Sequence, residues 1–355
     1  MRRAYIDNIR WMTVVLVMIY HVPYVFNNVG VPGGIGPKKC LEPMNAVLYF
    51  LYPWFMVLLF VISGMCARYS LEKISHKEFI KSKVDKLLIP STLGLFIIHP
   101  VTGYINITLG GVADLIPPFI RIPLYIISGS GVLWFAQLLF IFCLLLVLIR
   151  KVDKNERIYQ IGAKTNMFFL LILFFVVWGS AQILNPRYVI VYRFGIYFTV
   201  FLLGYFIFSH DEVTDKLKKY RYLLLVVTGI LAVMYVVAYW GKENVSIAVL
   251  KTAFTNLYAW MAVLTVLGCG KQWLGFENKI SKFMNHISYP LYVFHYPILL
   301  VTGYFLYRSF LPSGMIYMIS YVAEFVGAYI LYEIIRRIPF VRYLSLGIRK
   351  INSER

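Results

Sequence analysis

The stretch that decides the fold is Tyr5 to His21, YIDNIRWMTVVLVMIYH, a charged lead-in followed by an apolar run that carries a histidine. On a helix of 3.6 residues per turn, the eleven steps from Arg10 to His21 make three turns plus about 20°, so both side chains share a face. Asp7 lies on that face too, about 40° from His21. A rise of ~1.5 Å per residue places His21 about 16 Å beyond Arg10, half of a ~30 Å hydrocarbon core. With Arg10 at the membrane surface, the sequence predicts His21 near the midplane.

An ionisable side chain at that depth is costly and normally faces a protein interior or a wet cavity. The alternative is a neutral, packed histidine that hydrogen-bonds to a neighbouring helix. Because Asp7, Arg10 and His21 are aligned, the pattern favours a functional site over that alternative. A neutral imidazole can serve as a base or as a nucleophile, and the pattern leaves both roles open.

This spacing resembles the first helix of the acyltransferase 3 family of integral-membrane acyltransferases, in which an Arg, ten residues and a His follow one another. Arg10 and His21 stand at those two positions. The resemblance implies that His21 is the catalytic residue and that Asp7 and Arg10 orient the helix entrance. It also implies that Arg10 meets the phosphates of the donor.

Composition places the chain among membrane proteins. Sixty per cent of the 355 residues are hydrophobic, 14% are charged and the mean hydropathy is +0.72, which a soluble domain does not reach. The aromatic content of 17% exceeds the need of interfacial belts, so some Tyr and Phe side chains should line the interior. The net charge of +19 comes from basic residues between apolar stretches, so it indicates topology, and no nucleic acid is expected as a partner.

Ten apolar stretches of about 17 to 25 residues are candidate membrane helices. They are 9–28, 44–67, 87–109, 132–149, 166–184, 194–209, 222–240, 248–268, 286–307 and 315–335. The connections then alternate sides, and 27 of the 35 Lys and Arg residues fall on one side, which the positive-inside rule makes cytoplasmic. The sequence thus predicts an all-α, polytopic bundle of about ten spans in the cell membrane. It is expected to be a single domain, 1–355, with an uncleaved first span and both termini cytoplasmic.

Four cysteines are spread over this topology, and only Cys40 reaches the outer side, so no structural disulfide is expected. The middle spans, from Asn166 to Gly268, have no His or Cys cluster with metal-ligand spacing and are interpreted as scaffold. No metal is expected. The segment from Gly110 to Gly131 is too interrupted by Pro and Gly to span the membrane and is predicted to be an outer lid.

A basic connection, YSLEKISHKEFIKSKVDKLLIP, runs from Tyr69 to Pro90 after the second span. It is either a surface helix on anionic lipid headgroups or a phosphate-binding rim for a nucleotide-bearing donor. The resemblance favours the rim, because the family carries a basic-x-x-basic motif before its third span and Lys83 and Lys86 occupy those positions. Lys supplies the charge but not the bidentate geometry of the family's usual Arg.

Two further motifs are similar to those of the family. GVLWFAQLLF, from Gly131, resembles its Gly-x-Leu-Trp-Phe entry to the fourth span, where Trp134 is an interfacial anchor or a substrate contact. ISYPLYVFHYP, from Ile287, resembles its Ser-Tyr-x-x-Tyr-x-x-His signature, with Ser288, Tyr292 and His295 on one face. His295 is about 15 Å from the cytoplasmic end of its span, the depth of His21. It is either a packed histidine or a substrate contact, together with Tyr292.

Two more candidate substrate contacts have weaker support. Ser63 precedes Gly64 in FVISGMCARYS, a pair that favours close helix packing over chemistry. Glu324 is an intramembrane acid in the tenth span, whereas Glu333 near its end is expected to pair with Arg336 and Arg337.

The resemblance implies an enzyme that moves an acyl group from cytosolic acyl-CoA, its donor substrate, to a hydroxyl of a glycan or small molecule at the outer face. YIDNIR together with FVISGMCARYSLEK is most similar to the branch typified by the glucan succinyltransferases, the glucan biosynthesis protein C-like proteins of the cell envelope. O-acetylation belongs to the same chemistry. The alternative is a proton-coupled secondary transporter or exporter, since midplane histidines and Pro-broken helices suit alternating access. No internal repeat between the two halves of the chain supports that alternative.

Overall fold

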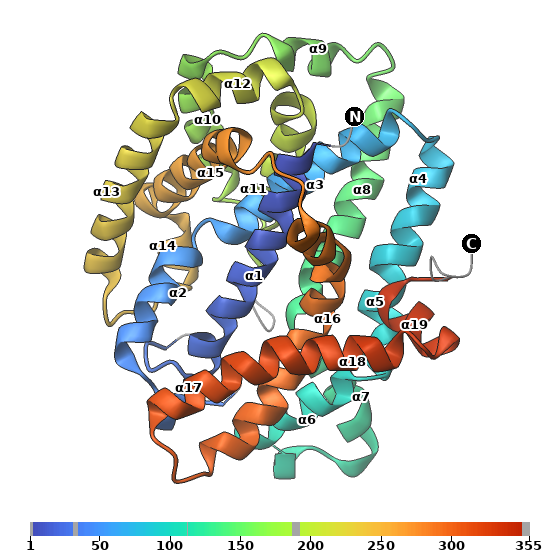
Figure 1. The fold of residues 1–355 in the computed structure, drawn as a ribbon, viewed down its shortest axis with the longest axis vertical. Coiled ribbons are helices and arrows are strands. Elements are labelled where there is room, and N and C mark those ends of the chain that lie inside the picture. The colour runs from blue at the N-terminus through green and yellow to red at the C-terminus, as the bar shows by residue number, and fades with distance from the viewer. Residues whose placement is uncertain (1–2, 31–34, 112, 187–191, 350–355) are drawn as a thin grey trace. The chain divides into compact units, whose positions relative to one another are not determined.

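The computed structural model describes residues 3–30, 35–111, 113–186 and 192–349. Over these ranges the chain folds into helices, and no β-strand occurs among them (Figure 1). The composition explains this outcome, because backbone polar groups in a bilayer need internal partners and a helix supplies them within one segment. The prediction of an all-α, polytopic membrane protein is confirmed.

Six of the described helices are long and apolar enough to cross a membrane, or up to eight if each of two bent helix pairs is one span. Two predicted spans fall short of that test. The helix α10 (Met167–Ser180) has 14 residues. The helix α16 (Lys279–Tyr307) has 29 residues, but its Tyr, His and Pro residues lower its hydropathy. The count of ten spans and the cytoplasmic position of both termini stay predictions.

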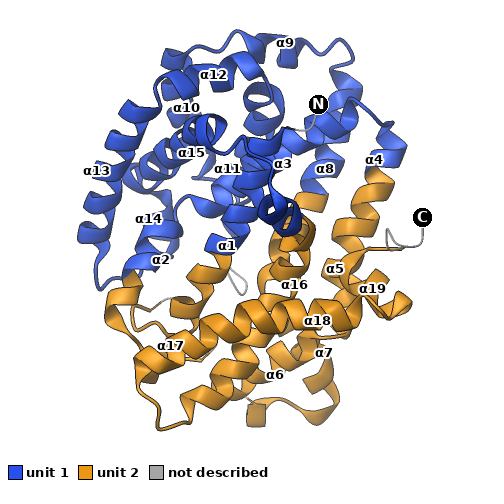
Figure 2. Ribbon diagram, in the orientation of Figure 1, with its two compact units in different colours: residues 1–16, 46–79, 141–285 blue, residues 17–45, 80–140, 286–355 orange. Residues whose placement is uncertain are grey.

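The chain forms two compact units, which Figure 2 shows in blue and orange. Unit 1 comprises 1–16, 46–79 and 141–285, and unit 2 comprises 17–45, 80–140 and 286–355. Five of the described helices contribute residues to both units: α1 (Ala4–Phe26), α2 (Asn45–Leu51), α4 (His76–Lys83), α8 (Trp134–Val152) and α16. The expectation of a single domain over 1–355 stays a prediction.

Unit 1 is built around α3 (Phe55–Leu71) and α11 (Phe194–Leu203), whose backbones approach closely at Gly64. A Cβ atom there would lie 2.0 Å from the carbonyl oxygen of Phe201, so only Gly fits. This supports the packing interpretation of the Ser63–Gly64 pair. The other elements of unit 1 are α2 (Asn45–Leu51), α9 (Arg157–Ala163), α10, the π-helix η7 (Gly204–Phe208), α12 (Asp211–Lys219), α13 (Arg221–Tyr239), α14 (Ile247–Lys251) and α15 (Ala253–Trp273).

Unit 2 is formed by short, broken elements around α16. Its helices are α5 (Ile89–Thr92), α6 (His99–Leu109), α7 (Pro118–Ser128), α17 (Ser313–Val322), α18 (Ala328–Ile335) and α19 (Pro339–Leu346). Its π-helices are η3 (Val84–Leu88) and η8 (Ala323–Gly327), and its 3-10 turns are η1 (Pro37–Lys39), η2 (Glu42–Met44), η4 (Leu93–Phe96), η5 (Ala113–Leu115) and η6 (Gly131–Leu133).

Two predicted features of unit 2 look different in the structure. The predicted span 87–109 is not one straight helix, because it bends by 60° between Phe96 and His99, where Pro100 opens α6. The predicted lid contains the helix α7, which packs on α6, and Asn106 donates to the Ser128 carbonyl at 3.2 Å.

Aromatic side chains fill the interior of each unit, as the composition predicts. In unit 1 the rings of Phe60 and Tyr197 stack 4.7 Å apart, and Tyr205, Tyr235 and Tyr258 are fully buried. In unit 2 the rings of Phe26 and Tyr317 pack 5.5 Å apart. The excess of Tyr and Phe over the need of interfacial belts is therefore used in the core.

Candidate functional site

His21 lies in the second half of α1, which belongs to unit 2, two residues before a proline. Pro23 has no N–H, so the carbonyl of Ile19, four residues earlier, lacks its helical partner. Tyr321 on α17 donates its hydroxyl to that carbonyl at 3.1 Å. This bond satisfies the exposed carbonyl and fixes the His21 end of α1 against α17.

His21 and His295, predicted separately at equal depth, meet in unit 2. Nε2 of His295 lies 3.3 Å from Nδ1 of His21, and the ring centroids are 5.1 Å apart. Each Nδ1 also faces the carbonyl four residues earlier in its own helix, 2.7 Å to Val17 for His21 and 3.0 Å to Leu291 for His295. His295 is fully buried, whereas His21 is partly exposed.

These partners assign the tautomers of the two rings. A carbonyl oxygen can only accept, so both Nδ1 atoms carry hydrogen in the neutral rings. Nε2 of His295 is then a bare acceptor, and the Nδ1–H of His21 is shared between it and the Val17 carbonyl. The Nε2 of His21 is left with a lone pair, which is the atom a general base needs.

Three tyrosine rings surround His21 edge-on. The centroids of Tyr20, Tyr24 and Tyr296 lie 5.4, 5.6 and 5.2 Å from that of the imidazole. They limit the approach to the ring and form an apolar wall around it. These tyrosines were not predicted as site residues from the sequence, although each lies within three positions of a predicted histidine.

A row of rings on α16 leads to the histidine pair. Tyr289 and Tyr292 stack with centroids 6.4 Å apart, and Tyr292 and His295 are 6.2 Å apart. The Tyr292 hydroxyl donates to the carbonyl of Val132, inside the predicted Gly-x-Leu-Trp-Phe motif. The two motifs quoted from the fourth and ninth predicted spans therefore meet at this site. Ser288 lies in the same helix and is buried.

The predicted basic rim adjoins the start of that row. Lys83 ends α4, and Lys86 lies in the π-helix η3 with its side chain exposed. Pro90 has no N–H to offer the Lys86 carbonyl, and the hydroxyl of Tyr289 donates to it instead, at 2.6 Å. The rim is thus joined through Tyr289 to the helix that carries His295.

Arg10 and Asp7 lie in unit 1 and pair with each other. Nη2 of Arg10 is 3.0 Å from Oδ1 of Asp7 and 3.4 Å from Oδ1 of Asn285. Both residues share the uninterrupted helix α1 with His21, so the predicted eleven-residue spacing on one helix holds.

Trp134 and Ser63 have different surroundings. Trp134 begins α8, and its ring lies 6.4 Å from that of Phe135, which in turn lies 6.0 Å from Tyr292. Trp134 is therefore one ring removed from the row on α16. Ser63 belongs to α3 of unit 1, next to the close approach at Gly64.

Glu324 is fully buried in the π-helix η8 of unit 2. Neither of its carboxylate oxygens has a hydrogen-bond partner among the described residues, nor does Oγ of Ser320, one turn earlier and also fully buried. Buried polar groups are nearly always paired, so two orphaned groups on one face need an explanation. π-helical turns are frequent at functional sites.

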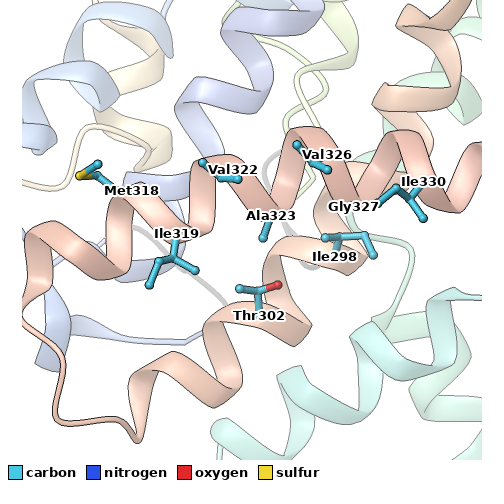
Figure 3. A pocket seen from close by; sticks show the side chains of 9 residues that line it. All are labelled: Ile298, Thr302, Met318, Ile319, Val322, Ala323, Val326, Gly327 and Ile330. Atoms are coloured by element: carbon cyan, nitrogen blue, oxygen red, sulfur yellow. The ribbon is translucent and has the colours of Figure 1, made fainter.

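An apolar groove of about 550 Å³ runs between α16 and the helices α17 and α18 (Figure 3). Of the nine described residues that line it, Thr302 alone has a polar side chain, and none is a predicted site residue. Elsewhere in the described residues, no group of three or more His, Cys, Asp or Glu side chains could hold a metal ion.

Comparison with known families bears on the whole chain. The model of the acyltransferase 3 family, described as an acyltransferase domain, matches residues 3–333, a range that includes Arg10 and both histidines. No curated protein and no solved structure matches. The family resemblance is confirmed, and with it an enzyme rather than an exporter, while the glucan succinyltransferase branch stays a prediction. The chain belongs to the acyltransferase 3 family, the multi-pass membrane enzymes that bring an acyl donor and an acceptor together at a lipid bilayer.

Proposed function

We propose that the protein transfers an acyl group from acyl-CoA to a hydroxyl of a glycan or small molecule, with His21 as general base. The observation that carries this proposal is the contact between His295 and His21. This contact leaves Nε2 of the partly exposed, neutral His21 imidazole without a proton, so it can accept one. The chain also belongs to a family of acyltransferases.

The chemistry follows from that lone pair. Nε2 of His21 takes the proton of the acceptor hydroxyl while the hydroxyl oxygen attacks the thioester carbonyl carbon. The carbon–sulfur bond then breaks, the acyl group remains on the acceptor oxygen as an ester, and the imidazolium returns the proton to the leaving CoA sulfur. Nε2 of His295 accepts from Nδ1–H of His21 throughout, which holds the ring and stabilises its charged form.

The donor enters along the α16 row in this proposal. Lys83 and Lys86 attract the phosphates of CoA. From Tyr289, which bonds the rim, six residues along α16 lead to His295, a rise of about 9 Å. The flexible pantetheine arm would carry the thioester along this path.

The acceptor hydroxyls explain the orphaned groups near α17. The side-chain oxygens of Glu324 and Ser320 have no hydrogen-bond partner among the described residues, and a polyol has several hydroxyls to donate to them. This supports a glycan or a similar small molecule as acceptor. We further propose that the enzyme lies in the cell membrane and modifies an envelope component, by O-acetylation or a related acylation, at the outer face.

The experiment uses the full chain in liposomes, supplied with a panel of acyl-CoAs from acetyl to succinyl and with a glycan acceptor. Release of free thiol that depends on the acceptor is expected for at least one donor, and His21→Ala serves as the blank. Thiol release by none of the panel, or equal release by His21→Ala, would show that acyl-CoA chemistry at His21 is not the function.

The rim is tested with the same assay. Lys83→Ala combined with Lys86→Ala should raise the apparent KM for acyl-CoA and leave folding unchanged, because charges that are at least partly exposed contribute little to stability yet can bind phosphate directly. An unchanged KM would assign both lysines to lipid or topology. Lys77→Ala, on the exposed surface of α4, is the matched control.

A further inference from the structure

A segment far along the chain packs on the basic rim within unit 2. The short helix α19 is followed by Gly347 and Arg349. Nη2 of Arg349 donates to Oδ1 of Asp85 at 2.9 Å, and the hydroxyl of Tyr343 donates to the same oxygen, also at 2.9 Å. Asp85 stands between Lys83 and Lys86, so the segment reaches the middle of the rim.

The docking of this segment depends on particular residues. Gly347 has a φ of +65°, and a Cβ atom there would lie 1.8 Å from the Asp85 carbonyl oxygen. A side chain would therefore be excluded twice, by conformation and by space. The chain can approach the rim this closely only with Gly at that position.

A buried arginine then fixes the backbone around Arg349. Arg342 is only 3% exposed, and it donates to the carbonyls of Arg336 at 2.8 Å, Ile348 at 3.2 Å and Arg349 at 2.9 Å. A buried guanidinium is tolerated only when its donors are satisfied, so these bonds hold the segment in one geometry.

The Arg349 side chain keeps most of its binding capacity. It is 59% exposed, and its bonds to Asp85 and Tyr343 both use Nη2, whereas a guanidinium has five N–H donors. The single negative charge of Asp85 does not offset the three positive charges of Lys83, Lys86 and Arg349. An arginine already held by a carboxylate loses less side-chain freedom when it binds a ligand.

We propose that Arg349 is a further donor-binding residue, which contacts a phosphate group of acyl-CoA beside Lys83 and Lys86. The inference rests on the proposed function, because it needs a CoA-bearing donor at the rim. Arg349 also supplies the planar, bidentate N–H geometry that the two lysines of the rim lack.

The test measures binding of CoA, which needs no knowledge of the acyl group. The full chain is placed in nanodiscs of phosphatidylcholine, and the Kd for CoA is measured by calorimetry. Arg349→Ala should weaken binding about three- to tenfold, the size of one exposed charge-assisted bond. Arg349→Lys should be intermediate. Arg337→Ala, which changes an exposed arginine outside the rim, should bind like the parent.

Two outcomes would overturn the inference. One is an Arg349→Ala protein that binds CoA as tightly as Arg337→Ala, which would leave the segment as a structural or lipid-binding feature. The other concerns Tyr343→Phe, which keeps the Arg349 side chain but removes one of the two hydrogen bonds to Asp85. If this protein loses as much affinity for CoA as Arg349→Ala does, the inference is wrong. A parent protein that does not bind CoA at all would instead refute the donor in the proposed function, and thiol release from acyl-CoA reports that separately.

Discussion

At the scale of single residues, the candidate site is a pair of histidines, each of which bonds to a backbone carbonyl of its own helix. Because both Nδ1 atoms face a carbonyl four residues earlier, the contact at 3.3 Å has only one consistent direction, from His21 to His295. In the proposed mechanism His295 is thus a positioning residue, and the reacting atom belongs to His21.

This assignment predicts unequal effects of two changes at His295. His295→Leu should lower kcat roughly tenfold to a hundredfold, the loss expected when one hydrogen bond to a developing charge is removed. His295→Gln keeps an oxygen that can accept from Nδ1–H, so it should recover much of that loss. The KM for the donor should change little in both. Equal kcat values for Leu and Gln, at equal melting temperatures, would argue against the positioning role.

The sequence predicted both histidines but not their contact. Helical spacing fixed which face His21 and His295 occupy and gave each a similar depth. Which turns of two helices meet depends on packing, and which nitrogen bonds the backbone depends on a side-chain rotamer. Residue spacing predicts neither the contacting turns nor the rotamers. Tyr20, Tyr24 and Tyr296 were missed for the same reason, since tyrosine in an apolar helix is ordinarily core or interface.

At the scale of elements, prolines shape unit 2 by leaving carbonyls without a helical partner. The hydroxyl of Tyr321 satisfies Ile19 before Pro23, and that of Tyr289 satisfies Lys86 before Pro90. A scan for apolar length gives little weight to such residues. It therefore predicted 87–109 as one span, where the structure has a 60° bend.

Unit 1 contains an ionic cluster that joins the ends of α3, α8 and α9. The buried Arg68 donates to Glu72 at 2.9 Å and to Glu156 at 3.0 Å, and its guanidinium stacks 3.6 Å from the centroid of Tyr159. Arg150 also pairs with Glu156. From the sequence, Arg68 and Arg150 count only as topology determinants, because the contact that joins the helices, from Arg68 to Glu156, spans 88 residues.

This cluster predicts a pH-dependent stability. The hydrogen bond from Arg68, with that from Arg150, lowers the pKa of Glu156 below its ordinary value of 4.5. A lowered folded-state pKa means that the carboxylate stabilises the fold above pH 4.5 and that this contribution is lost as the pH falls through the lower value. Glu156→Gln should therefore lower the melting temperature at pH 7.

The measurement is a thermal melt of the parent and Glu156→Gln in detergent, between pH 7 and pH 4. The gap between the two melting temperatures should narrow towards the acid end. Glu212→Gln is the control, because Glu212 is exposed and forms no ion pair among the described residues. A gap that is absent at pH 7, or that stays constant over the range, would contradict a stabilising role of the Glu156 charge.

At the scale of the whole molecule, composition decided the class and the family match confirmed it, but neither counts the spans. The described helices give six, or up to eight, against the ten of the prediction. The difference lies in particular elements: α10 is short, and the residues that make α16 chemically interesting also lower its hydropathy. A membrane helix that carries several Tyr, His and Pro residues is thus hard to recognise by apolarity alone.

Cysteine labelling tests the predicted topology. Cys40 is expected outside and Cys269 inside, and both are partly exposed and free. An impermeant maleimide should label a protein whose sole cysteine is Cys40 in intact cells. A protein whose sole cysteine is Cys269 should be labelled only after the cells are opened. Burial raises the pKa of the Cys40 thiol, so mildly alkaline buffer is needed. Labelling of Cys269 in intact cells would refute the ten-span arrangement.

The most direct test of the account is the rate of acyl transfer by His21→Gln in liposomes, with the protein shown to be inserted and to melt like the parent. Glutamine keeps a hydrogen-bonding side chain of similar size but cannot take a proton at pH 7. A general base contributes about 10² to 10⁴ in rate, so the account predicts a loss of at least a hundredfold in kcat. Transfer by His21→Gln at near-parental rates would contradict it.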